Sequence, residues 1–395
     1  MNYILFDDAR RNNLLPFTFL RPVADIRFGI LTIREKWEKH LNTKTSTLTE
    51  KYLRAKYPVV KAQHNFLING SICPNTRLIE EIHKLEPNQT LMKDDCLIAM
   101  HLTEHELERT SAKETQSVEE IYTDAPFCEI VNTYDIFLKN GRAIEEDFAI
   151  LTSGRKSVRI PAGVHSITPQ NIFIEEGAKV HSSYLNASAG PIYIGKDAEI
   201  MEGAMIRGPL ALCEGAIVKM GSKIYGPTTI GPQSKIGGEV NQSVIFGYSS
   251  KAHDGFLGHS VLAEWCNIGA DTNTSNLKNN YEPVRLWNYP EQSFVDTGLT
   301  FCGLLMGDHS KCGINTMFNT GTVVGVSANI YGTNFQRNFI SSFARGGTGG
   351  FTTYDVNKAI KVAEFVYKRR NFEFTDIDRD IFYHVFNITF EYRKL

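Results

Sequence analysis

Large aliphatic residues recur at every sixth position through the middle of the chain. The series is Ile194, Ile200, Ile206, Leu212, Val218, Ile224, Ile230 and Ile236. Four residues after each of the first seven stands a residue that is small in six of the seven cases: Ala198, Ala204, Leu210, Ala216, Ser222, Thr228 and Ser234. Neither a helix of period 3.6 nor a long strand of period 2 gives this pattern. It predicts a chain wound as a prism, with the aliphatic residue inside each flat side and the small residue at the corner.

Three such sides make an eighteen-residue coil, so residues eighteen apart should stack. We expect Ile194 to lie beside Leu212, and Leu212 beside Ile230, in parallel strands about 4.8 Å apart. An earlier pair with the same spacing places the start of this β-helix near residues 155–170.

The same phase returns later in the chain. It is found at Phe256, Leu262 and Ile268, and again at Met306, Cys312, Phe318, Val324 and Ile330. Residues 276–293 fit no six-residue repeat, and we expect them to form a loop outside the coil.

The two ends of the chain have other patterns. Residues 1–150 are expected to form an α/β domain, with strands at 2–6, 65–70 and 96–102 and a helix at 25–41. The β-helix is expected over 155–345. Two helices within 350–395 should then form a cap over the open end of the coils. The run ARGGTGGF at 344–351 lacks the GK[ST] ending of a phosphate-binding loop and is expected to be a flexible tether.

Composition excludes several classes of function. The 395 residues include 42 basic and 44 acidic side chains, a net charge of −2, which gives no electrostatic reason to expect nucleic acid as a partner. No apolar run approaches the ~20 residues of a membrane span, and the N-terminus lacks a signal-peptide layout. Seven cysteines without a CxxC pair indicate reduced thiols and a cytoplasmic location.

Three histidines occupy equivalent places in the repeat. His253, His259 and His309 each stand three residues after a register position of the repeat, which places them on the outside of the prism. His253 and His259 are one side apart and cannot serve one site in one subunit. Asp271, eighteen residues after His253, is expected directly above it, where a carboxylate could orient a general base. Spacing alone leaves open whether His253 is catalytic or a solvated surface residue.

Two segments resemble the acetyltransferase domain of the bifunctional GlmU family: IYIGKDAEIMEG, and KAHDGFLGHSVLAEWCNIGADTNTSN. HDGFLG matches the H-x-x-[YF]-L-G setting of the family's catalytic histidine, which implies that His253 is the general base and His259 a surface residue. LMGDHSKCGINTMFNTGTVVG matches the coils that follow. The resemblance implies a left-handed β-helix and a homotrimer, with acetyl-CoA sites between subunits.

Further site residues follow from this resemblance and from the repeat. Asp271 and Glu239 are the candidates to orient His253. The substrate-binding candidates are Lys223, Tyr225, Asn241, Phe256, Asn267, Asn276 and Lys278, and the candidates to contact the cofactor are Ala270 and Gly313. Tyr225 stands where the family has a phosphate-binding arginine, and Asn241 lies near a family lysine. The acceptor need not therefore be glucosamine-1-phosphate.

The N-terminal domain departs further from this family. In its uridylyltransferases a loop G-x-G-T-R-M binds the triphosphate. FDDARRNNLLPF places Arg10 at the arginine, a nucleotide-binding position, but Asp7 and Asp8 replace glycines and Phe17 stands at a following lysine. Two carboxylates are unfavourable beside a triphosphate unless a metal intervenes. We therefore expect a truncated nucleotidyltransferase-like domain, which would need Mg²⁺ only if it is active.

The expected function is transfer of an acetyl group from acetyl-CoA to an aminosugar phosphate, in the biosynthesis of UDP-N-acetylglucosamine and cell-envelope precursors. A sugar-1-phosphate nucleotidyltransferase is one alternative. A second is a zinc enzyme like the γ-class carbonic anhydrases, with His253, His259 and His309 as ligands, although their spacing does not match that family and we expect no metal site. A third is a non-catalytic trimer that binds a sugar nucleotide.

Overall fold

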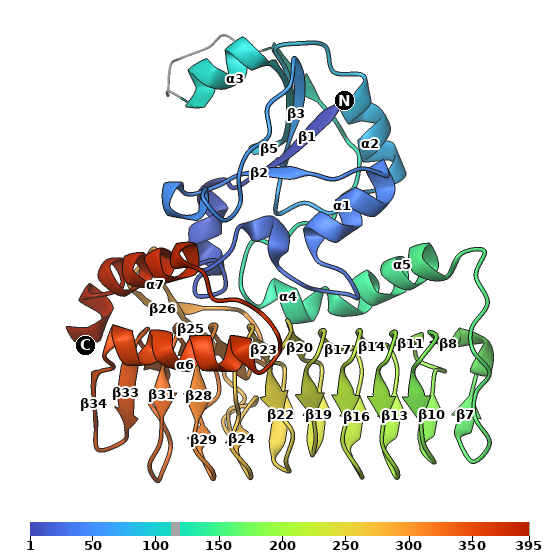
Figure 1. Cartoon of the computed structure of the whole chain (residues 1–395), viewed down its shortest axis with the longest axis vertical. Helices are drawn as coiled ribbons and strands as arrows, with labels where there is room; N and C mark the ends of the chain where they lie inside the picture. Colours follow the sequence, from blue (N-terminus) through green and yellow to red (C-terminus); the bar gives the residue numbers. More distant parts are fainter. Residues whose placement is uncertain (112–118, 395) are drawn as a thin grey trace. The chain divides into compact units, whose positions relative to one another are not determined.

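The structure, a computed structural model, describes residues 1–111 and 119–394 (Figure 1). Contacts divide the chain into two compact units. The first comprises Met1–Leu14, Leu20–Ile26 and Leu31–Val131; the second comprises Leu15–Phe19, Arg27–Ile30 and the chain from Asn132 onward. The domain boundary expected near residue 150 thus lies at residue 131. Two short N-terminal segments also belong to the second unit, because Phe17 and Phe28 are fully buried within it.

The first unit is built on one mixed sheet, of order β2-β1-β3-β5-β4-β6. Its strands are β1 (Asn2–Phe6), β2 (Ser46–Leu48), β3 (His64–Asn69), β4 (Gln89–Lys93), β5 (Cys96–Thr103) and β6 (Glu119–Tyr122). Its helices are α1 (Ile33–Leu41), α2 (Thr76–His83) and α3 (Glu104–Ser111). The three strands predicted from the sequence are confirmed. The helix predicted from residue 25 begins only at Ile33, where Thr32 and Glu35 form a capping box.

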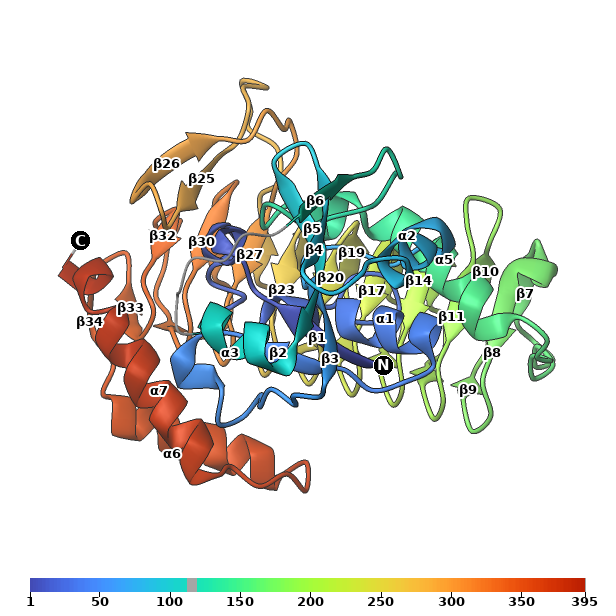
Figure 2. The ribbon, with the colours of Figure 1, turned by 90° about the horizontal axis from the view of Figure 1, so that it is seen from above.

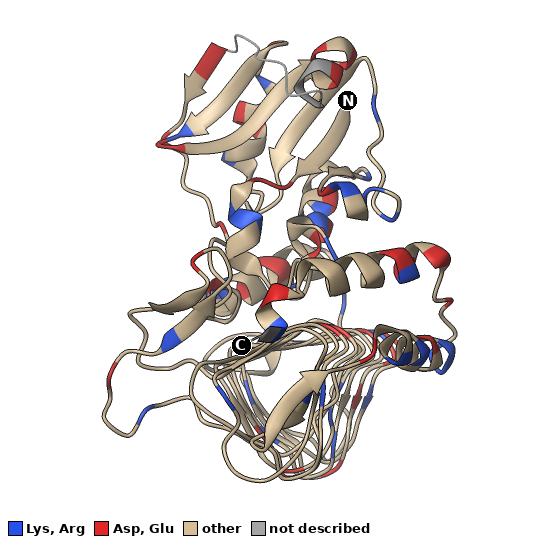
Figure 3. Cartoon of the chain, turned by 90° about the vertical axis from the view of Figure 1, so that its left-hand side faces the viewer, with Lys and Arg blue, Asp and Glu red and all other residues tan. Residues whose placement is uncertain are grey.

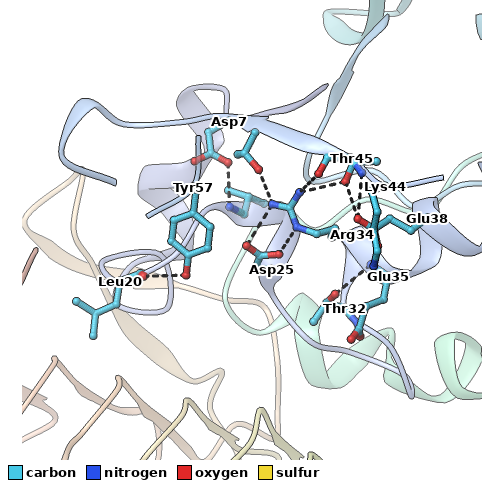
Figure 4. Close-up of polar contacts among 12 residues, drawn as sticks. Asp7, Leu20, Asp25, Thr32, Arg34, Glu35, Glu38, Lys44, Thr45 and Tyr57 are labelled. Carbon is cyan, nitrogen blue, oxygen red and sulfur yellow. Dashed lines mark hydrogen bonds and ion pairs between the residues drawn. The ribbon is translucent and has the colours of Figure 1, made fainter. Parts of the chain in front are cut away.

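A polar network fixes α1 beside the strands of the first unit (Figure 4). The Arg34 guanidinium binds both carboxylate oxygens of Asp25, at 2.5 and 3.2 Å, and the hydroxyl of Thr45 at 3.1 Å. Such two-point pairing restricts orientation more than a single contact does.

The second unit is a parallel β-helix with three faces. Face 1 consists of β7 (His165–Ile167), β10 (Tyr184–Asn186), β13 (Met205–Arg207), β16 (Lys223–Tyr225), β19 (Glu239–Asn241) and β22 (Phe256–Gly258), followed by β24 (Asn273–Thr274) and β29 (Met317–Phe318). Face 2 consists of β8 (Ile172–Ile174), β11 (Ile192–Ile194), β14 (Leu210–Leu212), β17 (Thr228–Ile230), β20 (Val244–Ile245), β23 (Val261–Leu262), β27 (Leu304–Met306), β30 (Thr322–Val324) and β32 (Phe339–Ile340). Face 3 consists of β9 (Lys179–Val180), β12 (Glu199–Ile200), β15 (Ile217–Val218), β18 (Lys235–Ile236) and β21 (Ser250–Lys251), followed by β28 (Lys311–Cys312), β31 (Asn329–Ile330), β33 (Ala344–Gly347) and β34 (Gly350–Thr353). Seen along the stack, the coils overlay as a triangle (Figure 3).

The six-residue repeat forms the core of this β-helix, as predicted. Ile194 pairs with Leu212 and Leu212 with Ile230, while Ile200 pairs with Val218. All eight residues of the main series are at most 3% exposed. Each coil therefore places one aliphatic side chain per face into a shared apolar interior, which is the dominant stabilising term for such a fold.

The coils shorten after residue 230, and this shifts the register of the next two. Ile230 pairs with Ile245, fifteen positions on, and Val240 pairs with Leu257, seventeen positions on. The prediction that Phe256 occupies an inner position is therefore wrong: Leu257 is 1% exposed, while Phe256 lies on the outside of face 1.

Face 2 is buried on its outer side as well. Helices α4 (Asp135–Leu138) and α5 (Asn140–Thr152) belong to this unit, and α5 contacts β17. The Thr229 hydroxyl donates to the carbonyl of Gly29 at 2.8 Å, and the Gly29 amide donates to Asn140 at 2.7 Å. Consecutive residues in the strands of face 2 are therefore buried, whereas in the strands of face 1 buried residues alternate with more exposed ones.

The excursion predicted at 276–293 leaves the coils and ends in a hairpin of β25 (Arg285–Asn288) and β26 (Ser293–Asp296) (Figure 2). The tether predicted at 344–351 is wrong, because β33 and β34 pair there as an antiparallel hairpin. Helices α6 (Val356–Lys368) and α7 (Asp376–Ile388) follow, as predicted. Residues of α6 line a small cavity against Lys311 and Ala328, so this helix lies along face 3. No helix among the residues that the structure describes is long and apolar enough to span a membrane.

Candidate active site

The outer side of face 1 brings most of the predicted substrate residues together. Neighbouring strands pair so that these residues form two rows: Lys223, Glu239 and Phe256 in one, and Tyr225, Asn241 and Gly258 in the other. The residues between the rows point inward and are buried. Strands of a sheet lie about 4.8 Å apart, so these side chains form one continuous surface, which we call the face 1 patch.

Asn276 joins this patch from the next coil. A Cβ placed on Gly258 would lie 2.5 Å from Cζ of Phe256 and 2.6 Å from Nδ2 of Asn276. The Phe256 ring and the Asn276 amide thus both lie over the bare backbone of Gly258. The Asn273 side chain fixes the strand beneath by accepting the Phe256 amide at 2.9 Å. Only glycine leaves room for this arrangement.

His253 lies beside the patch, at the corner between β21 of face 3 and β22 of face 1, and its side chain is exposed. The prediction that Asp271 lies directly above it is wrong by one residue. The Asp271 amide donates to the carbonyl of Asp254 at 3.1 Å, because this coil has seventeen residues instead of eighteen. Glu239 pairs with Phe256, three residues after His253, at the start of face 1.

A buried lysine beneath this corner was not anticipated. Lys251 pairs with Ile236 in the inner row of face 3 and is 2% exposed. Its ammonium donates to the carbonyls of His253 and, at 3.2 Å, Asp254. Burial lowers the pKa of Lys251 to about 8, against the opposing attraction of Asp254 and Asp271. The sequence signal was a lysine at a position that an aliphatic residue holds in the preceding coil, and the change in coil length concealed it.

Two residues predicted to contact the cofactor continue the same corner. The Ala270 carbonyl accepts from the Asn315 amide at 2.8 Å. Gly313 stacks closely on Gly269: a Cβ placed on Gly269 would lie 2.3 Å from the carbonyl of Gly313. His253, Ala270 and Gly313 therefore mark successive coils along one edge. The two cofactor positions carry little or no side chain that could obstruct a ligand.

The structure does not bring the remaining two substrate candidates into the patch. Asn267 is exposed on face 3, where it bridges Ser250 and Lys311 in the neighbouring coils. Lys278 lies in the excursion, and its ammonium donates to the carbonyl of Pro283 at 2.7 Å.

His259 is not the free surface residue that the sequence suggested. It is half-buried at the corner between faces 1 and 2, and its Nδ1 lies 2.8 Å from Nδ2 of Asn276. Its ring stacks on Phe301 at a centroid distance of 5.1 Å and meets the edge of Phe137 at 6.0 Å. Burial lowers the pKa of His259. The partners come from residues 137, 276 and 301, and local sequence could not reveal them.

The zinc alternative does not fit this geometry. His253, His259 and His309 lie at three different corners of the prism, and His309 is buried between the rings of Tyr367 and Phe382. Within residues 1–111 and 119–394, no group of three or more His, Cys, Asp or Glu side chains could hold a metal ion.

In the first unit, the predicted nucleotide-binding residue Arg10 has partners from its own unit. Its guanidinium binds the Glu129 carboxylate, lies 3.2 Å from the Cys96 sulfur and is 3.6 Å from Asp8. The Asp8 carboxylate also accepts from the Asn69 amide at 2.9 Å. The charges of this loop are thus balanced internally.

The neighbouring Asp7 is similarly engaged. Its carboxylate accepts from Arg11 at 2.7 Å, from the Thr49 hydroxyl at 2.5 Å and from the Val23 amide at 2.9 Å. Burial raises the pKa of Asp7, and Arg11 and these hydrogen bonds oppose that rise. Phe17, at the expected lysine position, is fully buried and packs on Phe246.

Comparison with known proteins gives relatives for this chain. Residues 3–156 match the family described as sugar nucleotidyl transferase. The bifunctional sugar-1-phosphate nucleotidylyltransferase/acetyltransferase of Sulfurisphaera tokodaii is 33% identical over 144 residues, 36% of this chain and 35% of that protein. The bifunctional protein GlmU of Methanocaldococcus jannaschii is 31% identical over 118 residues, 30% of this chain and 26% of that protein. The uncharacterized acetyltransferase YaiX of Escherichia coli O6:K15:H31 is 28% identical over 142 residues, 35% of this chain and 61% of that protein.

The chain therefore spans about a third of the length of the first of these relatives. The resemblance to the GlmU family that was drawn from the HDGFLG and NIGADTNTSN segments is confirmed at this modest level of identity. The chain is similar to sugar nucleotidyl transferases over residues 3–156, and to bifunctional nucleotidylyltransferase/acetyltransferases of the GlmU kind over about a third of its length.

Proposed function

We propose that the β-helix unit is a hexapeptide-repeat acyltransferase, which transfers the acetyl group of acetyl-CoA to the amine of an aminosugar phosphate. The observation that supports this most is the face 1 patch. It gathers a cation, a carboxylate, two aromatic rings and two amides beside an exposed histidine, in successive coils. The names of the relatives agree with an enzyme of this type.

In the proposed reaction, His253 takes a proton from the substrate ammonium, and the freed amine attacks the thioester carbonyl. The C–N bond forms, the C–S bond breaks, and CoA leaves as a thiol after taking up a proton. Backbone amides along the coil edge stabilise the oxyanion. Lys223, exposed at the end of its row, supplies the charge for the sugar phosphate. Glu239, which pairs with Phe256, is the residue proposed to orient the acceptor amine or His253.

The patch is an open surface, whereas acyl transfer benefits from a site that excludes water. A second copy of the chain would wall in His253 and its neighbours, as the homotrimer implied by the resemblance would. Sedimentation equilibrium tests this: a trimer supports the shared site, and a monomer that turns over substrate contradicts it.

The test of the function is release of free CoA from acetyl-CoA and glucosamine-1-phosphate. Loss of a general base lowers turnover by about 10²- to 10⁴-fold, which is the result expected for His253→Ala. His181→Ala is the matched control, because His181 is a partly exposed histidine at the same kind of corner, after β9. Equal turnover by wild type and His253→Ala would refute the assignment of the base. No turnover with any aminosugar phosphate would refute the reaction.

A second candidate function is nucleotidyl transfer to a sugar-1-phosphate by the first unit. The match of residues 3–156 to sugar nucleotidyl transferases favours it. The internal pairing of Asp7, Asp8 and Arg10 opposes it, because a triphosphate would have to displace these contacts. Release of pyrophosphate from a nucleoside triphosphate, dependent on Mg²⁺ and on Arg10, would establish this activity. Binding of a sugar nucleotide without either reaction would instead support a scaffold.

A further inference from the structure

We propose that His259 is a neutral hydrogen-bond donor of the acceptor site, through which the site recognises an oxygen of the sugar. This rests on the proposed function of the face 1 patch, and it corrects the expectation that His253 and His259 cannot serve one site in one subunit, because the two residues flank opposite ends of the same strand, β22. His259 directly follows Gly258, the last residue of the row that contains Tyr225 and Asn241. It is an ionisable side chain next to Asn276 that neither the repeat nor the resemblance assigned to the site.

The backbone of His259 is fixed on both sides. Its amide donates to the carbonyl of Asn241 in the coil before, at 3.0 Å, and its carbonyl accepts from the amide of Gly303 at 2.8 Å. With the ring packed between Phe301 and Phe137, the side chain has little freedom to turn. A donor held in place in this way needs no reordering when substrate binds, which is the condition for a specific polar contact.

The Asn276 contact sets the tautomer of the ring. The Nδ2 amide group of asparagine can only donate, so Nδ1 of His259 accepts at 2.8 Å and the ring hydrogen is on Nε2. Burial lowers the pKa of His259 and so disfavours the charged ring. The imidazole is therefore a neutral N–H donor at physiological pH. It does not act as a base at Nε2, which already carries the hydrogen.

The arrangement also changes the role of Asn276. Its amide is committed to His259, and it lies with the Phe256 ring over Gly258. At this position the substrate is therefore recognised by His259, and Asn276 orients the histidine. A neutral donor suits a hydroxyl or carbonyl oxygen of the sugar, while Lys223 serves the charged phosphate at the other end of the rows.

Steady-state kinetics of the full chain test the proposal. We expect His259→Ala to raise KM for glucosamine-1-phosphate by about tenfold, the value of one neutral hydrogen bond, with kcat and its pH profile retained. His259→Gln keeps an N–H donor and should recover part of that loss, which a purely structural role would not explain. An unchanged KM in a folded His259→Ala protein, or a fall in kcat with a displaced pH profile, would overturn the proposal.

The tautomer can be read directly by NMR of protein labelled with ¹⁵N-histidine, with His259→Gln used for assignment. We expect a pyridine-type Nδ1 and a pyrrole-type Nε2 from pH 6 to 8, and a shift of Nε2 on addition of glucosamine-1-phosphate. Asn276→Asp, which can only accept, should exchange the two nitrogen types. A pyridine-type Nε2 in wild type refutes the proposal. These readouts need no turnover, so failure of the acyltransferase assignment and failure of this inference are distinguishable.

Discussion

Replacement of Lys251 by methionine tests the most unusual residue of the β-helix core. The lysine occupies an inner position beside Ile236 and is 2% exposed. Methionine has a similar length and no charge, so it fits a position that aliphatic residues hold in the neighbouring coils. Lys251→Met therefore removes the ammonium with little change in packing.

The expected effect follows from the lowered pKa of Lys251, from 10.5 to about 8. Below pH 8 the lysine is charged in both the folded and the unfolded state, and the full penalty for burying it is present. Between pH 8 and 10.5 the unfolded state keeps a proton that the folded state has lost, so the free energy of unfolding rises with pH. The whole change corresponds to about 3 kcal/mol.

The assay is urea unfolding at several pH values from 7 to 10.5, for wild type, Lys251→Met and Lys235→Met. Lys235 is the matched control, since it neighbours the inner Ile236 and points to the outside of the same face. We expect wild type and the control to gain about 3 kcal/mol relative to Lys251→Met across this range. Parallel curves for all three proteins would refute the account of Lys251 as a buried charge.

Three further outcomes are expected. Gly258→Ala should displace Phe256 and Asn276, because its Cβ would lie 2.5 and 2.6 Å from them. We expect this variant to have a higher KM for the acceptor and a nearly unchanged melting temperature. An unaltered KM would show that neither side chain contacts substrate. Leu212→Ala should destabilise the fully buried core by about 2 to 5 kcal/mol in urea unfolding, and a loss below 1 kcal/mol would contradict the stacking of Ile194, Leu212 and Ile230. Asp7→Asn should remove the carboxylate that pairs with the buried Arg11 at 2.7 Å and destabilise the protein by about 3 to 5 kcal/mol; a neutral effect would indicate that the loop is open to a ligand.

The β-helix could be predicted because its six-residue repeat of buried aliphatic residues is visible in the sequence. A buried side chain every sixth residue is a physical requirement of each coil, and the series from Ile194 to Ile236 meets it without a gap. The hand of the coil is different, because the spacing of buried residues is the same in either hand. The left-handed assignment comes only from the resemblance to the GlmU family.

The sequence could not show where the coil changes length. Phe256 and Leu257 are both apolar, so either could be assigned to the inner position, and the choice decides which residues of that coil lie on the outside. That single step put Asp271 above His253 instead of Asp254, and it concealed Lys251 in the inner row. A phase error in a repeat leaves the fold correct and misplaces the site.

The rest of the site depended on contacts between distant parts of the chain. His259 is defined by Asn276 and Phe301, and Arg10 by Glu129. No local sequence pattern predicts such partners, because nothing in the segment around each partner distinguishes it from its neighbours. The residues of the face 1 patch could be named from the sequence because of the resemblance to the GlmU family together with the repeat.

The chain enters the β-helix unit three times, and this limits how such a protein can be assembled or exchanged. Phe17 is made early by the ribosome, yet the residue that covers it, Phe246, emerges 229 residues later. Likewise, Asn140 and Thr229, which form hydrogen bonds with Gly29, are synthesised long after it. The N-terminal third thus carries apolar groups that it cannot bury by itself while synthesis proceeds. No single cut separates the two units cleanly, so recombination could not exchange one for another without damaging the core that remains.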